Sequence, residues 1–182
     1  MTEVKADDLV YSKKVIEFLT VANEYCVFTE NLEKYSKEDI LLFYQKLLPL
    51  LYLKGALLPQ IGTDDNTALE HYVTEEKWEE IYTQISKKLE KDDKYFLIDD
   101  EAYVAKDAEN GIASVAEKLA DTYQDMKDFV MLYQKGSHAA KENAVDDCRQ
   151  LFEKHWGLIV IDAHRQIHRV LYQPGENTFE LE

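Results

Sequence analysis

Hydrophobic side chains recur along this chain at intervals of three and four residues, the spacing that places them on one face of an α-helix. The most regular run lies between residues 112 and 133, where the steps alternate between four and three. Its positions are Ile112, Ala116, Leu119, Tyr123, Met126, Val130 and Tyr133. A stripe this regular needs a facing helix that buries it. We therefore expect a helix over residues 112–133 that packs against another helix.

The same spacing predicts three earlier helices. Residues 8–28 form the first, the hydroxyl of Ser36 caps the second, and Thr74 opens the third. Pro49 lies inside the second helix, where it lacks an N–H and its ring clashes with the carbonyl one turn earlier, so we expect a kink or a break there. The almost wholly apolar residues 50–58 are then expected to form a short buried helix.

A last helix is predicted from about residue 139 to residue 172, after a left-handed stop at Gly136 and a cap at Ser137. Because the connection is short, this helix and the one over residues 112–133 are expected to be antiparallel neighbours. Residues 95–98 are apolar and short enough to be extended. A single strand has no evident partner, so we expect no sheet.

The composition agrees with a helical fold. A chain of 182 residues is long enough for one domain, and its 6 glycines and 3 prolines are few for a strand-rich fold with many tight turns. The predicted fold class is all-α: a single-domain helical bundle of five to six helices with a long C-terminal helix. We expect residues 1–172 to form this domain and residues 173–182 to be a flexible tail.

The formal net charge of −15 argues against partners that are nucleic acids or anionic membranes, because neutralising phosphates needs a basic surface. An acidic face for a basic partner remains open. The N-terminus lacks the pattern of a signal peptide, and no apolar run reaches membrane-spanning length. Cys26 and Cys148 lie in apolar helical surroundings, which suits buried thiols in a reducing compartment. We therefore expect a cytoplasmic protein.

Unusual side chains gather between residues 137 and 172, where all three arginines and four of the five histidines lie. Folding the last two helices back about residue 137 brings residues from the two helices together, to within about one turn. The expected neighbours are Asp121 with His155, Asp125 with Arg149, and Leu119 with Trp156. The far end of the last helix, from His164 to Arg169, is expected to meet the N-terminal helices or the acidic residues 99–109.

The candidate pocket that follows consists of Asp121, Asp125, His155 and Trp156. In one interpretation His155, oriented by Asp121, acts as a base or a ligand, and Gly157 leaves space beside it. In the other, His155 is a core histidine bonded to a carboxylate, the indole of Trp156 is packed, and Gly157 lets a neighbouring helix approach closely.

Two places in the sequence have residue types that metal sites use. His164 and His168 are four residues apart, as in zinc sites, but Arg165 and Arg169 flank them and favour internal ion pairing. The helical stripe of Asp121, Asp125 and Asp128 has the oxygen ligands that magnesium uses. A second acidic motif on another helix is not evident, and exposure on a helix surface explains these aspartates too. We predict no catalytic residues, no metal site and no cofactor.

Two segments resemble a known bacterial family. The run Leu119-Ala120-Asp121-Thr122-Tyr123-Gln124-Asp125-Met126-Lys127-Asp128-Phe129, followed later by His155-Trp156-Gly157, is similar to the domain of unknown function 5063. Leu50-Leu51-Tyr52 and Ala56-Leu57-Leu58-Pro59 also look like that family. The likeness covers most of residues 10–172. It implies a compact all-helical protein and brings no established activity with it.

Two functions follow from the sequence. The first is a non-catalytic cytoplasmic domain that binds a protein or a small ligand, because no complete catalytic constellation is present. The alternative is a metal-dependent phosphohydrolase of the all-helical type, using the acidic cluster of Asp121 and Asp125 together with His155. The sequence leaves the ligand, the partner and the oligomeric state open.

Trp156→Ala tests whether the indole belongs to the core. If the indole is buried, the substitution should lower the free energy of unfolding by about 3–5 kcal/mol, measured by urea denaturation. A loss near zero would mean that the indole is exposed and available for binding.

Overall fold

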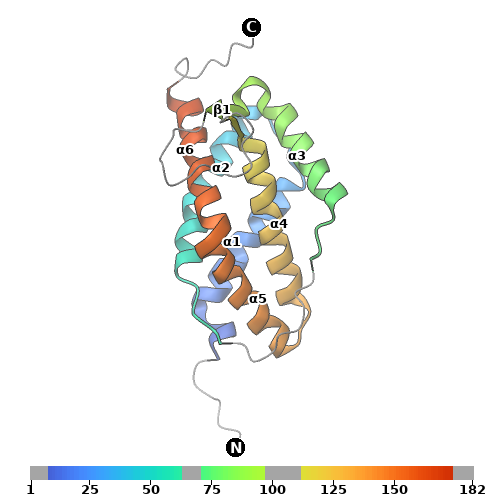
Figure 1. The fold of residues 1–182 in the computed structure, drawn as a ribbon, viewed down its shortest axis with the longest axis vertical. Coiled ribbons are helices and arrows are strands. Elements are labelled where there is room, and N and C mark those ends of the chain that lie inside the picture. Colours follow the sequence, from blue (N-terminus) through green and yellow to red (C-terminus); the bar gives the residue numbers. More distant parts are fainter. Residues whose placement is uncertain (1–7, 63–70, 97–111, 174–182) are drawn as a thin grey trace, which may run out of the picture.

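The computed structural model describes residues 8–62, 71–96 and 112–173. This part of the chain is a helical bundle with one small sheet (Figure 1). Its α-helices are α1 (Lys13–Thr29), α2 (Lys37–Ala56), α3 (Glu75–Leu89), α4 (Val115–Gln134), α5 (His138–Leu151) and α6 (Gly157–Tyr172). The predicted all-α class is confirmed. The tail at residues 174–182 and the acidic residues 99–109 lie outside the described residues.

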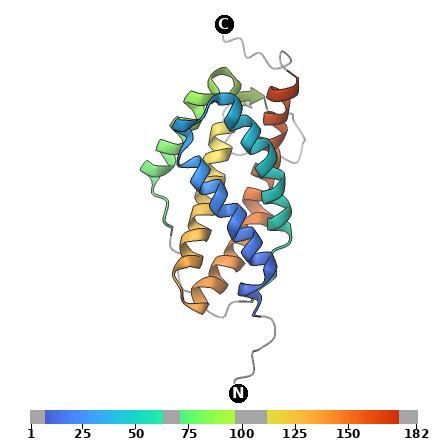
Figure 2. The same ribbon diagram turned by 180° about the vertical axis from the view of Figure 1, so that it is seen from behind.

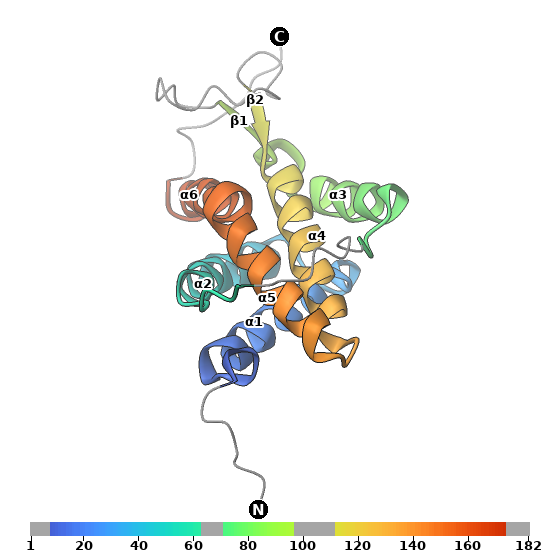
Figure 3. The same cartoon turned by 60° about the horizontal axis from the view of Figure 1, so that its bottom comes forward.

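Helix α4 is the central element of the bundle. It contacts α1, α3, α5 and α6, and it lies between α3 and α6 in the view of Figure 3. Its buried residues are Val115, Ala116, Leu119, Ala120, Thr122, Tyr123, Met126, Phe129, Val130 and Tyr133. The predicted stripe is therefore buried from Ala116 onward, and its neighbours are buried as well. Helix α2 completes the bundle by packing against α1 and α6 (Figure 2).

A two-stranded antiparallel sheet precedes α4. Strand β1 (Lys94–Phe96) pairs with β2 (Ile112–Ser114), and Tyr95 lies opposite Ala113. The prediction of no sheet is wrong, and so is the predicted start of a helix at Ile112. Strands of three residues are too short to show an alternating pattern in the sequence. Strand β2 was not predicted because its apolar residue Ile112 also fits the spacing of the helical stripe.

A buried carboxylate fixes the beginning of α4. Asp93 is 1% exposed and accepts hydrogen bonds from Ser86 Oγ (2.9 Å), Ser114 Oγ (2.8 Å) and the backbone N–H of Ala116 (2.8 Å). The first turn of a helix carries unpaired N–H groups and a partial positive charge, both of which an aspartate satisfies. Asp93 thus joins the end of α3, the sheet and α4.

The predicted caps at Ser36, Thr74 and Ser137 and the predicted stop at Gly136 are confirmed. The first helix begins at Lys13, after a 3₁₀ turn at Leu9–Tyr11, and not at residue 8 as predicted. Ser36 and Asp39 form a reciprocal capping box at the start of α2, and Thr74 Oγ1 accepts from the N–H of Lys77 at the start of α3. Gly136 has φ +92°, the left-handed conformation that glycine adopts most easily. Ser137 Oγ then accepts from the N–H of Ala140.

Helix α2 continues through Pro49, so the predicted break is wrong. Proline removes the N–H that would bond to the carbonyl of Gln45 one turn earlier. In this fold Nε2 of His164 on α6 lies 3.2 Å from that carbonyl oxygen. The neighbouring helix therefore supplies the donor that Pro49 lacks.

The segment after Pro49 is also not the short buried helix that we expected. Leu50, Leu53 and Leu57 are 39%, 53% and 41% exposed. Only Leu51, Gly55 and Leu58 within residues 50–58 are buried. The segment is the second half of an amphipathic helix whose outer face also carries leucines.

The long C-terminal helix is present, but a π-helical turn at Phe152–Trp156 divides it into α5 and α6. A π turn holds more residues than an α turn, so it rotates the buried face. His155, expected on the apolar face, is exposed, whereas Trp156 is 0% exposed. A Cβ at Gly157 would lie 2.4 Å from the carbonyl oxygen of Phe152, so this turn requires glycine there.

The indole of Trp156 lies in the core between several helices. Its Nε1 donates to the carbonyl of Cys148 at 3.0 Å, and its ring stacks on Phe18 of α1 with centroids 5.8 Å apart. A Cβ built on Gly55 of α2 would lie 2.2 Å from the indole Cη2 atom. Gly55 is therefore the position that lets α2 approach the indole.

None of the described helices is both long and apolar enough to cross a membrane.

Gly55→Ala should overpack this contact, because its Cβ would overlap two atoms of the indole. We expect a loss of about 1–3 kcal/mol in the free energy of unfolding, measured by urea denaturation. Gly62→Ala is the matched control, since nothing lies within 4 Å of its Cβ position, and it should be neutral or slightly stabilising. Equal effects of the two substitutions would contradict this packing.

Candidate functional site

The three aspartates on the partly buried flank of α4 each bind a different partner. Asp121 Oδ1 accepts from the indole Nε1 of Trp78 at 2.9 Å. Asp125 Oδ2 lies 3.0 Å from Nδ1 of His155. The contact to His155 is thus displaced by one helical turn from the expected Asp121, which is within the precision of the fold-back estimate.

Asp128 holds the chain that leads into α3. Its Oδ1 accepts from the backbone N–H groups of Tyr72 (2.7 Å) and Val73 (3.1 Å), and its Oδ2 lies 2.9 Å from Nδ1 of His71. A carboxylate that receives this many bonds serves to fix the loop. Asp128 therefore has a structural role that its place in the acidic stripe did not reveal.

The four residues of the candidate pocket divide into two environments. Asp125 and His155 form an ion pair at the surface, with side chains 12% and 48% exposed. Trp156 points into the core and is 0% exposed. Arg149, expected beside Asp125, instead pairs with Glu153 in its own helical run at 2.7 Å. The structure brings Asp125 and His155 together and separates Trp156 from them.

Three side chains on or beside this flank have shifted pKa values. The hydrogen bond that the His155 ring donates to Asp125 raises the pKa of His155 above its ordinary value, and nearby Asp121 acts in the same direction. Burial raises the pKa of the Asp121 carboxyl, against the opposing effect of its bond from Trp78. Burial and the charge of Asp125 also raise the pKa of Asp147 on α5. These carboxyls and the His155 ring therefore bind protons more readily than they would in water.

Sequence reasoning missed two members of this flank, Asp147 and His71. The fold-back relation about residue 137 pairs Asp147 with position 127, beside Asp128, so Asp147 could have been found. His71 lies outside the helices, and no periodicity places it. Among the described residues, no three His, Cys, Asp or Glu side chains are grouped so that they could hold a metal ion.

His164 and His168 both contact Gln45 on α2 rather than an acidic residue. His164 Nε2 meets the backbone carbonyl at 3.2 Å, and His168 Nδ1 lies 3.3 Å from the side-chain Nε2. The expected ion pairing is thus replaced, among the described residues, by hydrogen bonds to α2. The far end of the last helix does meet an N-terminal helix, as predicted.

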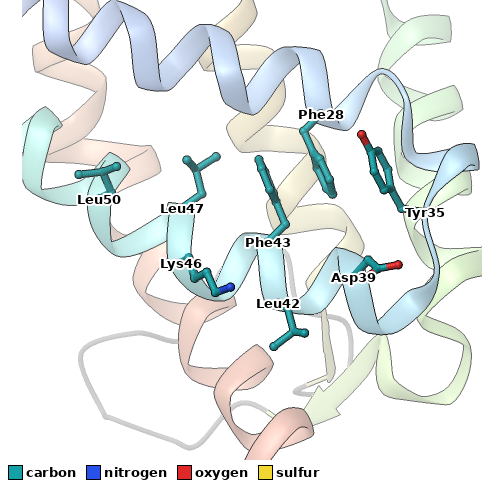
Figure 4. Close-up of a pocket in the computed structure, with 8 residues that line it drawn as sticks. All are labelled: Phe28, Tyr35, Asp39, Leu42, Phe43, Lys46, Leu47 and Leu50. Atoms are coloured by element: carbon teal, nitrogen blue, oxygen red, sulfur yellow. The ribbon is translucent and has the colours of Figure 1, made fainter.

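An apolar groove lies on a different face, beside α2. Its volume is about 530 Å³, and it is lined by Phe28, Tyr35, Asp39, Leu42, Phe43, Lys46, Leu47 and Leu50 (Figure 4). Phe28 stacks on Phe43 with ring centroids 3.5 Å apart and on Tyr35 at 4.6 Å. The sequence held a signal for this face, because α2 has too many leucines and aromatics for one buried stripe.

Comparison with known proteins gives the family. A family model described as domain of unknown function (DUF5063) matches residues 9–173. The chain belongs to the DUF5063 family. The resemblance seen in its sequence is thereby confirmed.

A solved structure of another protein has the same fold as this DUF5063 chain. The crystal structure of protein BF1032 from Bacteroides fragilis is 33% identical in sequence, covers 92% of this chain and 98% of its own, and superposes with a TM-score of 0.81. No curated protein matches this chain. The comparisons therefore give a fold and a family, and the function must be argued from the geometry.

Asp125→Asn should lower the pKa of His155 toward its ordinary value of about 6.5, because it removes the carboxylate that stabilises the charged ring. A pKa raised on folding means that the pair stabilises the fold below that ordinary value and that this contribution is lost as the pH rises through the folded pKa. NMR titration of the His155 ring measures the shift, and melting curves of both proteins measure the difference in stability.

Asp146→Asn is the control for this experiment. It also removes one negative charge from the flank, but Asp146 bonds to Gln150 and should leave the His155 titration nearly unchanged. An unaltered His155 pKa in Asp125→Asn would show that the ion pair does not hold in solution.

Proposed function

We propose that this DUF5063 chain is a non-catalytic domain that binds another protein through the groove beside α2. The groove is the observation that carries the proposal. It presents stacked aromatic rings and leucines to the surface, with Asp39 and Lys46 as its charged groups. Interfaces are enriched in aromatic residues and have apolar centres with polar margins.

The aspartates on the flank of α4 already have partners within the protein, which favours the groove over this flank as the binding site. Trp78, His155 and the chain at residues 71–73 already occupy the carboxylates of Asp121, Asp125 and Asp128. Side chains engaged in this way fix the packing of neighbouring helices. The groove, by comparison, holds exposed apolar surface, and contiguous apolar surface on a folded protein commonly marks an interaction site.

The alternative, a metal-dependent phosphohydrolase, required Asp121, Asp125 and His155 to converge. The contacts of these residues do not favour it, since Asp121 bonds to Trp78 instead of joining the other two. The reading would regain support if the purified protein carried stoichiometric metal, or if magnesium or manganese raised its melting temperature.

A cytoplasmic location also belongs to the proposal. It is supported by Cys26 and Cys148, which are both buried and unpaired. Burial raises the pKa of the Cys26 thiol to about 12, so the thiol stays protonated and inert at neutral pH.

The dye 1-anilinonaphthalene-8-sulfonate, whose aromatic rings bind exposed apolar surface, tests the groove at low micromolar protein concentration. We expect the dye to bind the wild type and to shift backbone NMR signals of the groove residues. Leu50→Asp should weaken this binding about tenfold or more, because a carboxylate in the groove opposes the aromatic rings of the dye and repels its sulfonate. Both fluorescence and the NMR map measure the effect.

Ile161→Asp supplies the matched control. Ile161 on α6 is 45% exposed, close to the 39% of Leu50, but it does not line the groove. Equal dye binding by both variants, or NMR shifts outside the groove, would contradict the groove as the binding site.

A further inference from the structure

We infer that the protein bound by this groove is a second copy of the same chain, packed through α2 about a two-fold axis. The inference rests on the proposed function and names its partner. Its support comes from the outer face of α2, from the charge balance of that helix, and from the positions of its two charged groove residues.

The apolar surface of α2 extends beyond the groove. Phe43 and Leu50 line the groove, and Leu53 and Leu57 continue the same helical stripe with 53% and 41% exposure. Residues 43 to 57 span about 21 Å along a helix. A surface of this length is suited to another helix rather than to a small molecule.

The charges of α2 permit two copies to meet on this helix. It carries Lys37, Lys46 and Lys54 against Glu38 and Asp39, so its net charge is +1 within a chain of −15. Two such chains repel one another through the rest of their surfaces. Lys37 and Lys54 pair with Asp92 and Glu17. The groove itself therefore carries one negative and one positive group, Asp39 and Lys46, and contact there adds little to this repulsion.

The two charged groove residues complement each other across a two-fold axis. Asp39 and Lys46 are seven residues apart, about two turns on one face of α2. An antiparallel pairing of two α2 helices that sets Asp39 against Lys46 of the second copy also sets Lys46 against Asp39 of the second copy. The same register brings Leu42 beside Phe43 of the second copy near the axis.

Both charged groups are available for this contact. None of the ion pairs between described residues involves Lys46. Asp39 uses its Oδ2 atom to bond to the backbone and hydroxyl of Ser36. Its Oδ1 atom is left for Lys46 of the second copy.

The aromatic stack gives the contact a rigid centre. Phe28 is 8% exposed and holds Phe43 on one side and Tyr35 on the other. Aromatic side chains fixed in advance lose little conformational entropy on binding, which is why they dominate the affinity of many interfaces.

Reversing the two charges tests the pairing by analytical ultracentrifugation. The wild type should sediment as a dimer at protein concentrations well above the low micromolar range of the dye test, in which the monomer keeps its groove open. Asp39→Lys alone and Lys46→Glu alone each place like charges opposite one another, so each should raise the dimer dissociation constant about a hundredfold. An equimolar mixture of the two variants restores both attractive contacts and should sediment as a heterodimer of wild-type affinity.

Glu24→Lys and Lys14→Glu are the matched controls. They make the same two charge changes at exposed positions of α1 outside the groove and should leave the dimer intact. Asp39→Lys also removes a helix cap, so its melting temperature is followed in parallel. Lys46→Glu leaves the cap in place and keeps the test valid by itself.

The outcomes separate the inference from the proposed function. A wild type that stays monomeric but binds the dye in the groove overturns the second copy as partner and leaves the groove as a binding site. Single variants that remain dimeric, or a mixture that stays monomeric, overturn the antiparallel pairing. A protein that neither dimerises nor binds the dye in its groove overturns both.

Discussion

The packing of one indole constrains the arrangement of the whole bundle. Trp156 has no exposed surface, stacks on Phe18 of α1 and meets α2 where Gly55 provides no side chain. Three elements distant in sequence thus depend on one ring. Because protein interiors are packed as densely as crystals, none of these elements can move without moving the others.

The π turn before α6 and the proline in α2 show how the bundle satisfies local irregularities. The π turn directs Trp156 inward and leaves His155 at the surface, where Asp125 on α4 meets it. Pro49 leaves a carbonyl without its donor, and His164 lies within bonding distance of it. His155 and His164, which the sequence offered as a candidate base and a candidate metal ligand, thus form hydrogen bonds to neighbouring helices.

The sequence predicted the parts of the fold that local chemistry determines. Helix caps and stops act on the adjacent backbone, so the residue type alone predicts them, as at Ser36, Thr74, Gly136 and Ser137. The strand pair and the π turn depend on distant partners, and a single turn of extra length leaves no periodic signal. At the candidate site, the fold-back placed the His155 contact within one turn but could not tell which side chain faced the core. The groove escaped prediction because exposed leucines on α2 resemble core leucines.

The π turn has a consequence for how this chain can vary in length. An α-helix rotates by about 100° for each residue, so deleting one residue between Phe152 and Trp156 would turn the inner face of α6 by that angle relative to α5. Either the face of α5 that packs on α4 or the face of α6 that packs on α2 would then point outward. Insertions and deletions should therefore accumulate in the connections between helices and be excluded from this stretch, even though one of its residues is already surplus to a regular helix.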